Sequence, residues 1–177
     1  MGYFLVSPLR RLRQDPRRIL SPFLRPDLHV LEIGPGMGFF TLPIARMIAP
    51  GGRIVAVDIQ QEMLARLRKR AQRAGLSDRI STRLAGGNSL EIGDLNGTID
   101  FALAFAVVHE IPYREQFFRE LAAAMKPDGT VLMADPKGHC SEQDFEGYQL
   151  LARQAGFRTA PGPTVFGSHS AILTIAG

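Results

Sequence analysis

The segment Val30–Thr41 constrains the fold of this chain more than any other stretch of its sequence. A short apolar run is followed by glycines at alternate positions, Gly34, Gly36 and Gly38, and then by a longer apolar segment. This pattern predicts a buried strand, a tight turn and a helix that begins at Gly38. Glycine lets a backbone turn sharply and approach a ligand closely, and the first N–H groups of a helix lack partners within it. The turn is therefore expected to bind an anionic or polar ligand.

The spacing of the glycines separates two classes of nucleotide-binding turn. A dinucleotide-binding turn has its third glycine at the position of Phe39, whose bulk disfavours close approach of a pyrophosphate. The chain also lacks a Tyr-x-x-x-Lys catalytic pair, which disfavours an oxidoreductase that uses NAD or NADP. The Glu-x-Gly-x-Gly-x-Gly pattern from Glu32 instead resembles the class I S-adenosylmethionine-dependent methyltransferases. In that family the turn wraps the methionine part of the cofactor.

Further motifs extend the resemblance over about residues 28–136. Asp58 ends the next apolar run, where the family has an acid that binds the ribose hydroxyls. Ile99–Pro112 and Met125–Pro136 are similar to the family's fourth-strand and fifth-strand motifs. Asn88 stands where an acid usually meets the adenine amino group, and its side-chain carbonyl can still accept that hydrogen bond. The resemblance implies S-adenosyl-L-methionine as the cofactor, bound by Glu32, Gly34, Pro35, Gly36, Gly38, Asp58, Ile59, Gly87, Asn88, Ser89 and Phe105.

Alternating strand and helix patterns along the chain imply an α/β sandwich with right-handed crossovers. With the resemblance, they predict one domain over residues 1–177, in three layers around a Rossmann-like, mostly parallel seven-stranded sheet whose last strand is antiparallel. Ahead of the core at 28–177, residues 1–27 form a basic segment in which a short helix starts at Asp15-Pro16 and ends near Ser21-Pro22. This segment is either a surface helix against the sheet or a lid over the site. Helices are expected at about 38–49, 61–74 and 117–125 and from Ser141, and strands at about 30–33, 54–58, 79–84, 99–106, 130–135, 157–160 and 170–176.

Composition and charge limit the partners and the location. The net charge of +4 permits binding to nucleic acid but does not favour it, because the arginines are dispersed. Arg66, Arg70 and Arg73, for example, are predicted to form a solvated helix face. The single cysteine, Cys140, excludes an internal disulfide and a cysteine-rich metal site. The sequence shows no signal peptide, no myristoylation pattern and no apolar run of about 20 residues, so no membrane span and a cytoplasmic location are expected.

His109 is the first candidate for a catalytic side chain. Methyl transfer needs the acceptor atom held in line behind the methyl group, so positioning contributes much of the catalysis and a general base is optional. His109 follows the fourth strand, and imidazole is suited to proton transfer near neutral pH. Its alternative role is to cap a helix or to bond a backbone carbonyl. Weaker candidates on neighbouring loops are Glu110, Tyr113, Asp135, His139 and His169.

The acceptor is predicted to be a small molecule. Related enzymes that methylate exocyclic nucleobase amines carry an Asn/Asp-Pro-Pro-aromatic turn where this chain has Ala106–His109. The connection Pro136–Cys140 is short and leaves little protein to close a pocket, so the N-terminal segment or a second subunit of a homo-oligomer is expected to complete the site. Two alternatives stay open: an RNA methyltransferase, and a non-catalytic subunit that binds the cofactor or a partner.

Overall fold

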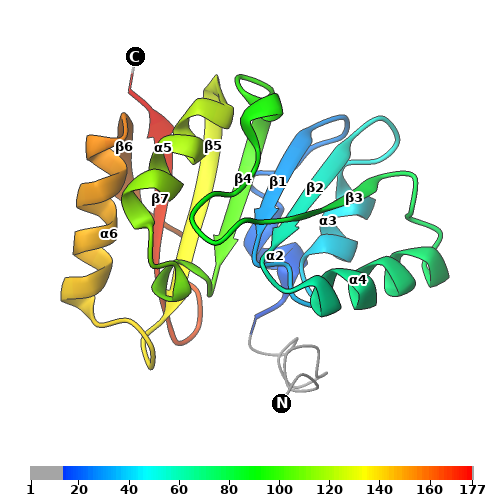
Figure 1. Ribbon diagram of the computed structural model, residues 1–177, viewed down its shortest axis with the longest axis horizontal. Helices are drawn as coiled ribbons and strands as arrows, with labels where there is room; N and C mark the ends of the chain where they lie inside the picture. The colour runs from blue at the N-terminus through cyan, green and yellow to red at the C-terminus, as the bar shows by residue number, and fades with distance from the viewer. Residues whose placement is uncertain (1–13, 177) are drawn as a thin grey trace.

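The structure of the protein, a computed structural model, describes residues 14–176. Its centre is one sheet made of β1 (His29–Ile33), β2 (Arg53–Asp58), β3 (Ile80–Leu84), β4 (Ile99–Phe105), β5 (Met125–Pro136), β6 (Phe157–Pro161) and β7 (Ser168–Ile175). The strand order is β3-β2-β1-β4-β5-β7-β6 (Figure 1). Strands β1 to β5 run parallel, whereas β7 is antiparallel to both of its neighbours. The predicted sheet is therefore confirmed.

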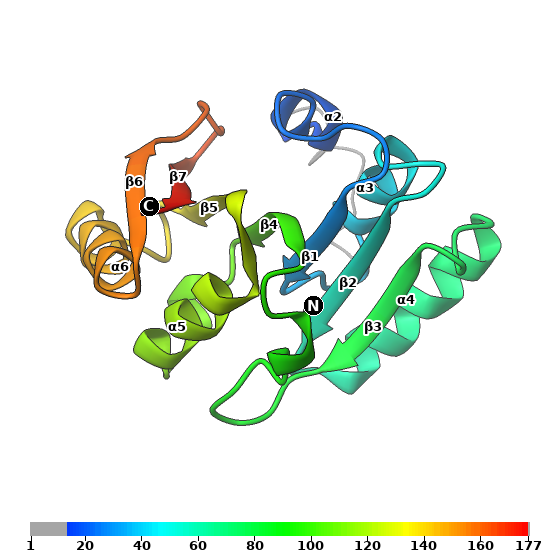
Figure 2. The ribbon, with the colours of Figure 1, turned by 90° about the horizontal axis from the view of Figure 1, so that it is seen from above.

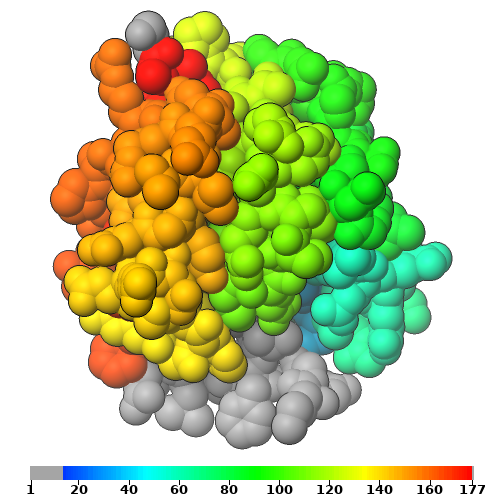
Figure 3. All heavy atoms as spheres, turned by 60° about the vertical axis from the view of Figure 1, so that its left-hand side comes forward, coloured from blue at the N-terminus to red at the C-terminus, as the bar shows by residue number. Residues whose placement is uncertain are grey.

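Helices cover both faces of the sheet and make the expected three layers (Figure 2). One face carries α2 (Pro16–Leu20), α3 (Thr41–Met47) and α4 (Gln61–Arg73), and the other carries α5 (Arg114–Ala124) and α6 (Glu142–Gln154). Helices α5 and α6 lie side by side on their face (Figure 3). Two short 3₁₀ turns, η2 (Gly93–Leu95) and η3 (Val108–Glu110), flank β4. No helix within residues 14–176 is both long and apolar enough to cross a membrane.

Alternate residues of the central strands belong to two separate apolar cores. In β4, Phe101, Leu103 and Phe105 pack with residues of α2, α3 and α4. Ala102 and Ala104 of the same strand pack with residues of α5 and α6. A parallel strand covered on both faces has no polar side, which explains the nearly continuous apolar sequence of β4.

The helix after the glycine-rich turn begins later than predicted. Gly38 has φ of +84°, a conformation that a right-handed helix does not contain, so a helix starting at Gly38 was wrong. The Gly38 N–H donates to the Pro35 carbonyl at 2.9 Å and closes a turn instead. Helix α3 then starts at Thr41 with no side-chain cap.

Strand β5 begins at Met125 and not at Thr130, so the turn predicted at 126–129 lies within it. Residues 126–129 bulge out of register with β4 beside Asp100. The Lys126 ammonium donates to Asp100 Oδ1 at 2.6 Å, which ties the bulge to the neighbouring strand. The sequence Pro127-Asp128-Gly129 is typical of a turn, but pairing on both sides of the bulge keeps it in the sheet.

Two predicted helix starts are confirmed by their caps. The Asp15 carboxylate accepts from the Arg17 N–H at 3.0 Å, and α2 ends at Leu20 with Ser21 as its C-cap. At α6, Ser141 Oγ accepts from the Asp144 N–H at 3.1 Å and the Asp144 carboxylate accepts from the Ser141 N–H at 3.0 Å. The remainder of the predicted basic N-terminal segment, residues 1–13, lies outside the described residues.

Candidate functional site

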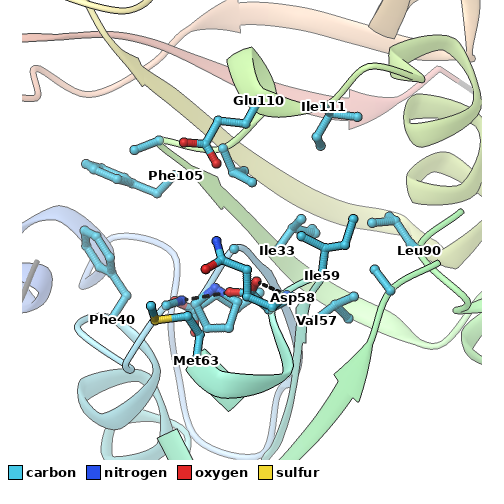
Figure 4. Close-up of a pocket in the computed structure, with 18 of the residues that line it drawn as sticks. Ile33, Phe40, Val57, Asp58, Ile59, Met63, Leu90, Phe105, Glu110 and Ile111 are labelled. Atoms are coloured by element: carbon cyan, nitrogen blue, oxygen red, sulfur yellow. Dashed lines mark hydrogen bonds between the residues drawn. The ribbon is translucent and has the colours of Figure 1, made fainter. Parts of the chain in front are cut away.

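A cavity of about 270 Å³ lies at the carboxyl ends of β1, β2 and β4 (Figure 4). The chain order reverses between β1 and β4, and such switch points in open α/β sheets are where ligands bind. The cavity is lined by Glu32, Ile33, Gly34, Pro35, Gly36, Met37, Phe39, Phe40, Val57, Asp58, Ile59, Gln60, Met63, Ala85, Leu90, Phe105, Ala106, Val107, Glu110, Ile111, Pro112 and Tyr113.

The three glycines of the turn have different surroundings. A Cβ added to Gly34 would lie 2.7 Å from Val107 Cγ2, so the glycine allows the turn to touch the loop after β4. A Cβ on Gly36 would meet no protein atom within 4 Å, and Gly36 lines the cavity. A Cβ on Gly38 would lie 2.5 Å from Leu67 Cδ1 of α4. Gly36 therefore leaves room for a ligand, whereas Gly38 lets α4 pack closely and does not line the cavity.

Asp58 connects the end of β2 to the glycine-rich turn. Its Oδ1 accepts from the Gln60 N–H at 2.9 Å and its Oδ2 accepts from the Gly36 N–H at 3.3 Å. Burial raises the pKa of the Asp58 carboxyl, and these backbone hydrogen bonds oppose the rise by favouring the charged form. The carboxylate thus shapes the turn and also faces the cavity (Figure 4).

Glu32 places a second carboxyl group at the floor of the cavity. Its exposed fraction is 3%, and burial raises its pKa from 4.5 to about 7. The Thr41 hydroxyl opposes the rise and the Asp58 carboxylate adds to it. Glu32 Oε2 is buried and has no hydrogen-bond partner among the described residues. A buried acceptor of this kind favours a ligand that donates hydrogen bonds or carries positive charge.

Charge and shape define two ends of the cavity. Glu32, Asp58 and Glu110 line it, and no Lys, Arg or His does so within residues 14–176. At one end the Phe40 and Phe105 rings pack with centroids 4.5 Å apart. Ile59, Leu90 and other apolar side chains stand at the other end (Figure 4). The cavity therefore fits a cationic ligand with an extended apolar or flat portion.

Seven of the predicted cofactor-binding residues line this cavity, and four lie elsewhere. The seven are Glu32, Gly34, Pro35, Gly36, Asp58, Ile59 and Phe105. Gly38 packs on α4, whereas Gly87, Asn88 and Ser89 form a turn closed by the Gly86 N–H donating to the Ser89 carbonyl at 2.9 Å. The Asn88 side chain is exposed, and Ala85 and Leu90 line the cavity in its place. The sequence of this exposed loop gives no signal that Ala85 and Leu90, which flank the turn, line the cavity while Asn88 at its tip does not.

Two arginines predicted to be solvated contact the glycine-rich turn instead. The Arg70 guanidinium donates to the Met37 carbonyl. Arg66 Nη1 lies 3.7 Å from Met37 Sδ, and Arg66 Nη2 pairs with Glu62 at 2.6 Å. Arg73 is exposed as predicted. The helical spacing of these arginines was visible in the sequence, but the position of α4 beside the turn was not.

His109 is held beside the cavity by groups from distant parts of the chain. Its Nδ1 lies 2.8 Å from Asp135 Oδ1, and its Nε2 lies 3.8 Å from Glu110 Oε1. The His139 ring stacks on it with centroids 5.3 Å apart. His109 itself does not line the cavity, although Glu110 and Tyr113 do. His169 pairs with Asp135 across β5 and β7, and its ring stacks on Phe145.

Comparison with known proteins identifies the family. The family model described as "Methyltransferase domain" matches residues 31–133. The chain belongs to the class I S-adenosylmethionine-dependent methyltransferases. The chain matches a solved S-adenosylmethionine-dependent methyltransferase from Aquifex aeolicus with a TM-score of 0.85, at 23% identity, covering 98% of this chain and 96% of that one. At that identity the likeness shows the shared fold.

Two curated relatives carry more specific names. The chain is 29% identical over 111 residues to the demethylmenaquinone methyltransferase of Symbiobacterium thermophilum, covering 63% of this chain and 43% of that protein. It is 28% identical over 136 residues to the nocamycin O-methyltransferase of Saccharothrix syringae, covering 76% of this chain and 48% of that protein. The chain thus spans less than half the length of either relative. Within residues 14–176, no three His, Cys, Asp or Glu side chains are arranged to hold a metal ion.

Proposed function

We propose that this chain transfers the methyl group of S-adenosyl-L-methionine to a small-molecule acceptor. The observation that carries the proposal is the cavity itself, where the glycine-rich turn, Asp58 and Glu32 meet beside two aromatic rings. The two named relatives are called methyltransferases of a quinone precursor and of nocamycin, both small molecules.

The lining residues fit the cofactor in charge and in shape. S-adenosylmethionine supplies an electrophilic methyl group on a positively charged sulfur. Carboxylates at Glu32 and Asp58 match an ammonium group and ribose hydroxyls, and the open space at Gly36 permits close approach of the backbone. Ile59 and Leu90 would flank the flat adenine ring. Asn88, Gly87 and Ser89 lie outside the cavity, so we assign the contacts from that loop to Ala85 and Leu90.

The acceptor would lie at the aromatic end of the cavity. Phe40 and Phe105 offer an apolar wall there, and His109 and Glu110 lie in the turn η3 that follows the carboxyl end of β4. We retain His109 as the candidate base, although its side chain does not line the cavity. Proximity and alignment supply much of the acceleration in such a displacement, so the wall is expected to matter as much as the base.

A nucleic-acid acceptor is less well supported. Three carboxylates line the cavity with no cationic side chain among its lining residues within 14–176, which repels a phosphate backbone. RNA methylation that falls steeply with added salt would favour that alternative. Cofactor binding without turnover on any acceptor would favour a non-catalytic binding subunit.

Calorimetric titration with S-adenosylhomocysteine tests the proposal. We expect micromolar binding by the unchanged protein and about 10-fold to 100-fold weaker binding by Asp58→Ala, because a hydrogen bond to a charged group contributes about 1.5–3 kcal/mol. Asp78→Ala removes an exposed carboxylate outside the cavity and serves as the matched control. Binding of NAD in preference to S-adenosylhomocysteine, or equal affinities of the two variants, would contradict the proposal.

A further inference from the structure

Three of the four histidines of the chain gather around one buried carboxylate. Asp135 lies at the carboxyl end of β5 with no exposed surface. His109 bonds to it, His139 stacks on His109, and His169 occupies the register position opposite Asp135 on β7. The remaining histidine, His29, is exposed at the start of β1. The cluster brings together η3, the end of β5, the loop after β5 and the start of β7.

Asp135 fixes the orientation of the His109 ring. A carboxylate withdrawn from water requires a hydrogen-bond donor, and the nearest side-chain donor is His109 Nδ1 at 2.8 Å. Burial raises the pKa of Asp135, and the His109 imidazole opposes the rise by favouring the charged carboxylate. With Nδ1 as the donor, Nε2 of the neutral ring keeps its lone pair. The ring is therefore held with its proton-accepting nitrogen away from Asp135.

The backbone around His109 is held as firmly as the ring. The Arg114 guanidinium donates to the Val108 carbonyl at 3.1 Å and to the His109 carbonyl at 2.9 Å. Its guanidinium carbon also lies 5.0 Å from the centre of the Tyr148 ring, which anchors Arg114 to α6. The turn η3 is thus fastened to α5 and α6. Small movements of the ring relative to the cavity are restricted.

Glu110 links His109 to the cavity. Its Oε1 lies 3.8 Å from His109 Nε2, and its side chain is 68% exposed. The Glu110 side chain lines the cavity and points into it (Figure 4). The His109 side chain, by contrast, is 14% exposed and is not part of the lining. A proton leaving a bound acceptor would meet Glu110 first and His109 second.

We propose that Glu110, His109 and Asp135 form a proton path, and that the acceptor of this enzyme is a hydroxyl group that loses its proton as it is methylated. The inference rests on the proposed methyltransferase function. The O–H bond breaks with its electron pair left on oxygen, and the oxygen bonds to the methyl group as the methyl–sulfur bond breaks and leaves its electron pair on the sulfur of S-adenosylhomocysteine. Glu110 accepts the proton, and Nε2 of His109 then receives it while Asp135 balances the imidazolium charge. The proton returns to solvent when the product leaves. A thioether or tertiary amine acceptor has a free lone pair and needs no such path.

The tautomer of His109 tests the path without any acceptor. Two-bond ¹⁵N–¹H correlation spectra at about pH 9 should show His109 protonated at Nδ1, and Asp135→Asn should abolish that preference. His109→Gln identifies the resonances, and His29→Gln is the control that leaves them unchanged. Protonation of His109 at Nε2 in the unchanged protein would overturn the path even if S-adenosylhomocysteine binds. Absence of S-adenosylhomocysteine binding with the Nδ1 tautomer present would overturn the proposed function instead.

Paired acceptors test the chemistry. With S-adenosylmethionine at about pH 8, methylation of a phenol should fall about 100-fold or more in His109→Gln and about 10-fold or more in Asp135→Asn and Glu110→Gln. Methylation of the matching thiophenol, whose sulfur is already ionised, should change less than about threefold. The loss should appear in kcat, with KM for the phenol nearly unchanged. Equal losses for the two acceptors, or no loss in Glu110→Gln, would overturn the path.

Discussion

Glu32→Gln should stabilise the protein at alkaline pH while weakening its affinity for S-adenosylhomocysteine. The pKa of Glu32 is about 7 in the folded protein against 4.5 for the ordinary carboxyl group. The folded state therefore binds more protons than the unfolded state between these values, and its stability falls as pH rises through that window. A shift of this size corresponds to about 3 kcal/mol lost above pH 7. Glutamine stays neutral and does not incur that loss.

Chemical denaturation at a series of pH values measures this effect. The difference in unfolding free energy between Glu32→Gln and the unchanged protein should grow in favour of the variant by about 3 kcal/mol from pH 4.5 to pH 8. Glu146→Gln, an exposed position on α6, should show no such pH dependence. A constant difference for Glu32→Gln across the range would contradict the prediction, and so would unchanged S-adenosylhomocysteine affinity.

The opposite effects on stability and affinity have a common cause. The carboxyl group of Glu32 is buried with an oxygen that no described residue satisfies, so the folded protein without ligand carries an unfavourable group. A cationic ligand in the cavity would compensate for that group. Binding sites often retain such destabilising groups because removing them costs affinity.

Gly34→Ala should destabilise the protein strongly, whereas Gly36→Ala should mainly weaken binding. Both glycines have positive φ, +69° and +52° respectively, which costs an alanine about 1 kcal/mol. At Gly34 the added Cβ would also lie 2.7 Å and 2.9 Å from the stiff Val107 side chain. We therefore expect Gly34→Ala to lower the free energy of unfolding by roughly 2–4 kcal/mol. At Gly36 the Cβ meets no protein atom and enters the cavity, so S-adenosylhomocysteine should bind at least about tenfold more weakly.

The variant Gly75→Ala separates the cost of backbone strain from the cost of the steric contact with Val107. Gly75 has φ of +66° and open space around its Cβ position, at the end of α4 and away from the cavity. The Gly75→Ala variant should lose about 1 kcal/mol of unfolding free energy and keep its affinity for S-adenosylhomocysteine. Denaturation and calorimetry on the three variants check both predictions. Equal destabilisation by Gly34→Ala and Gly75→Ala would show that the contact with Val107 contributes nothing.

The sequence predicted the features of the fold and site that depend on neighbouring residues. The apolar run, the glycines and the position of Asp58 at a strand end together indicated the turn and the sheet, and the family resemblance that they carry implied the cofactor. The caps at Asp15 and Ser141 were readable for the same reason, because each involves residues two or three positions apart. Periodicity and turn chemistry report the local conformation, and local conformation was sufficient to place the carboxyl ends of the strands together.

Contacts between distant segments were decided only by the tertiary structure. His109 and Asp135 are 26 positions apart, and Arg70 reaches Met37 across 33 positions. Two local features likewise depend on which segments pack together. They are the positive φ of Gly38, which delays the start of α3 to Thr41, and the bulge beside Asp100. No spacing rule encodes these contacts, because they arise from the packing of helices and loops on the finished sheet. The sequence by itself therefore determined the fold and, through the family resemblance, the cofactor, whereas the proposed proton path and the exact lining of the cavity follow from three-dimensional packing.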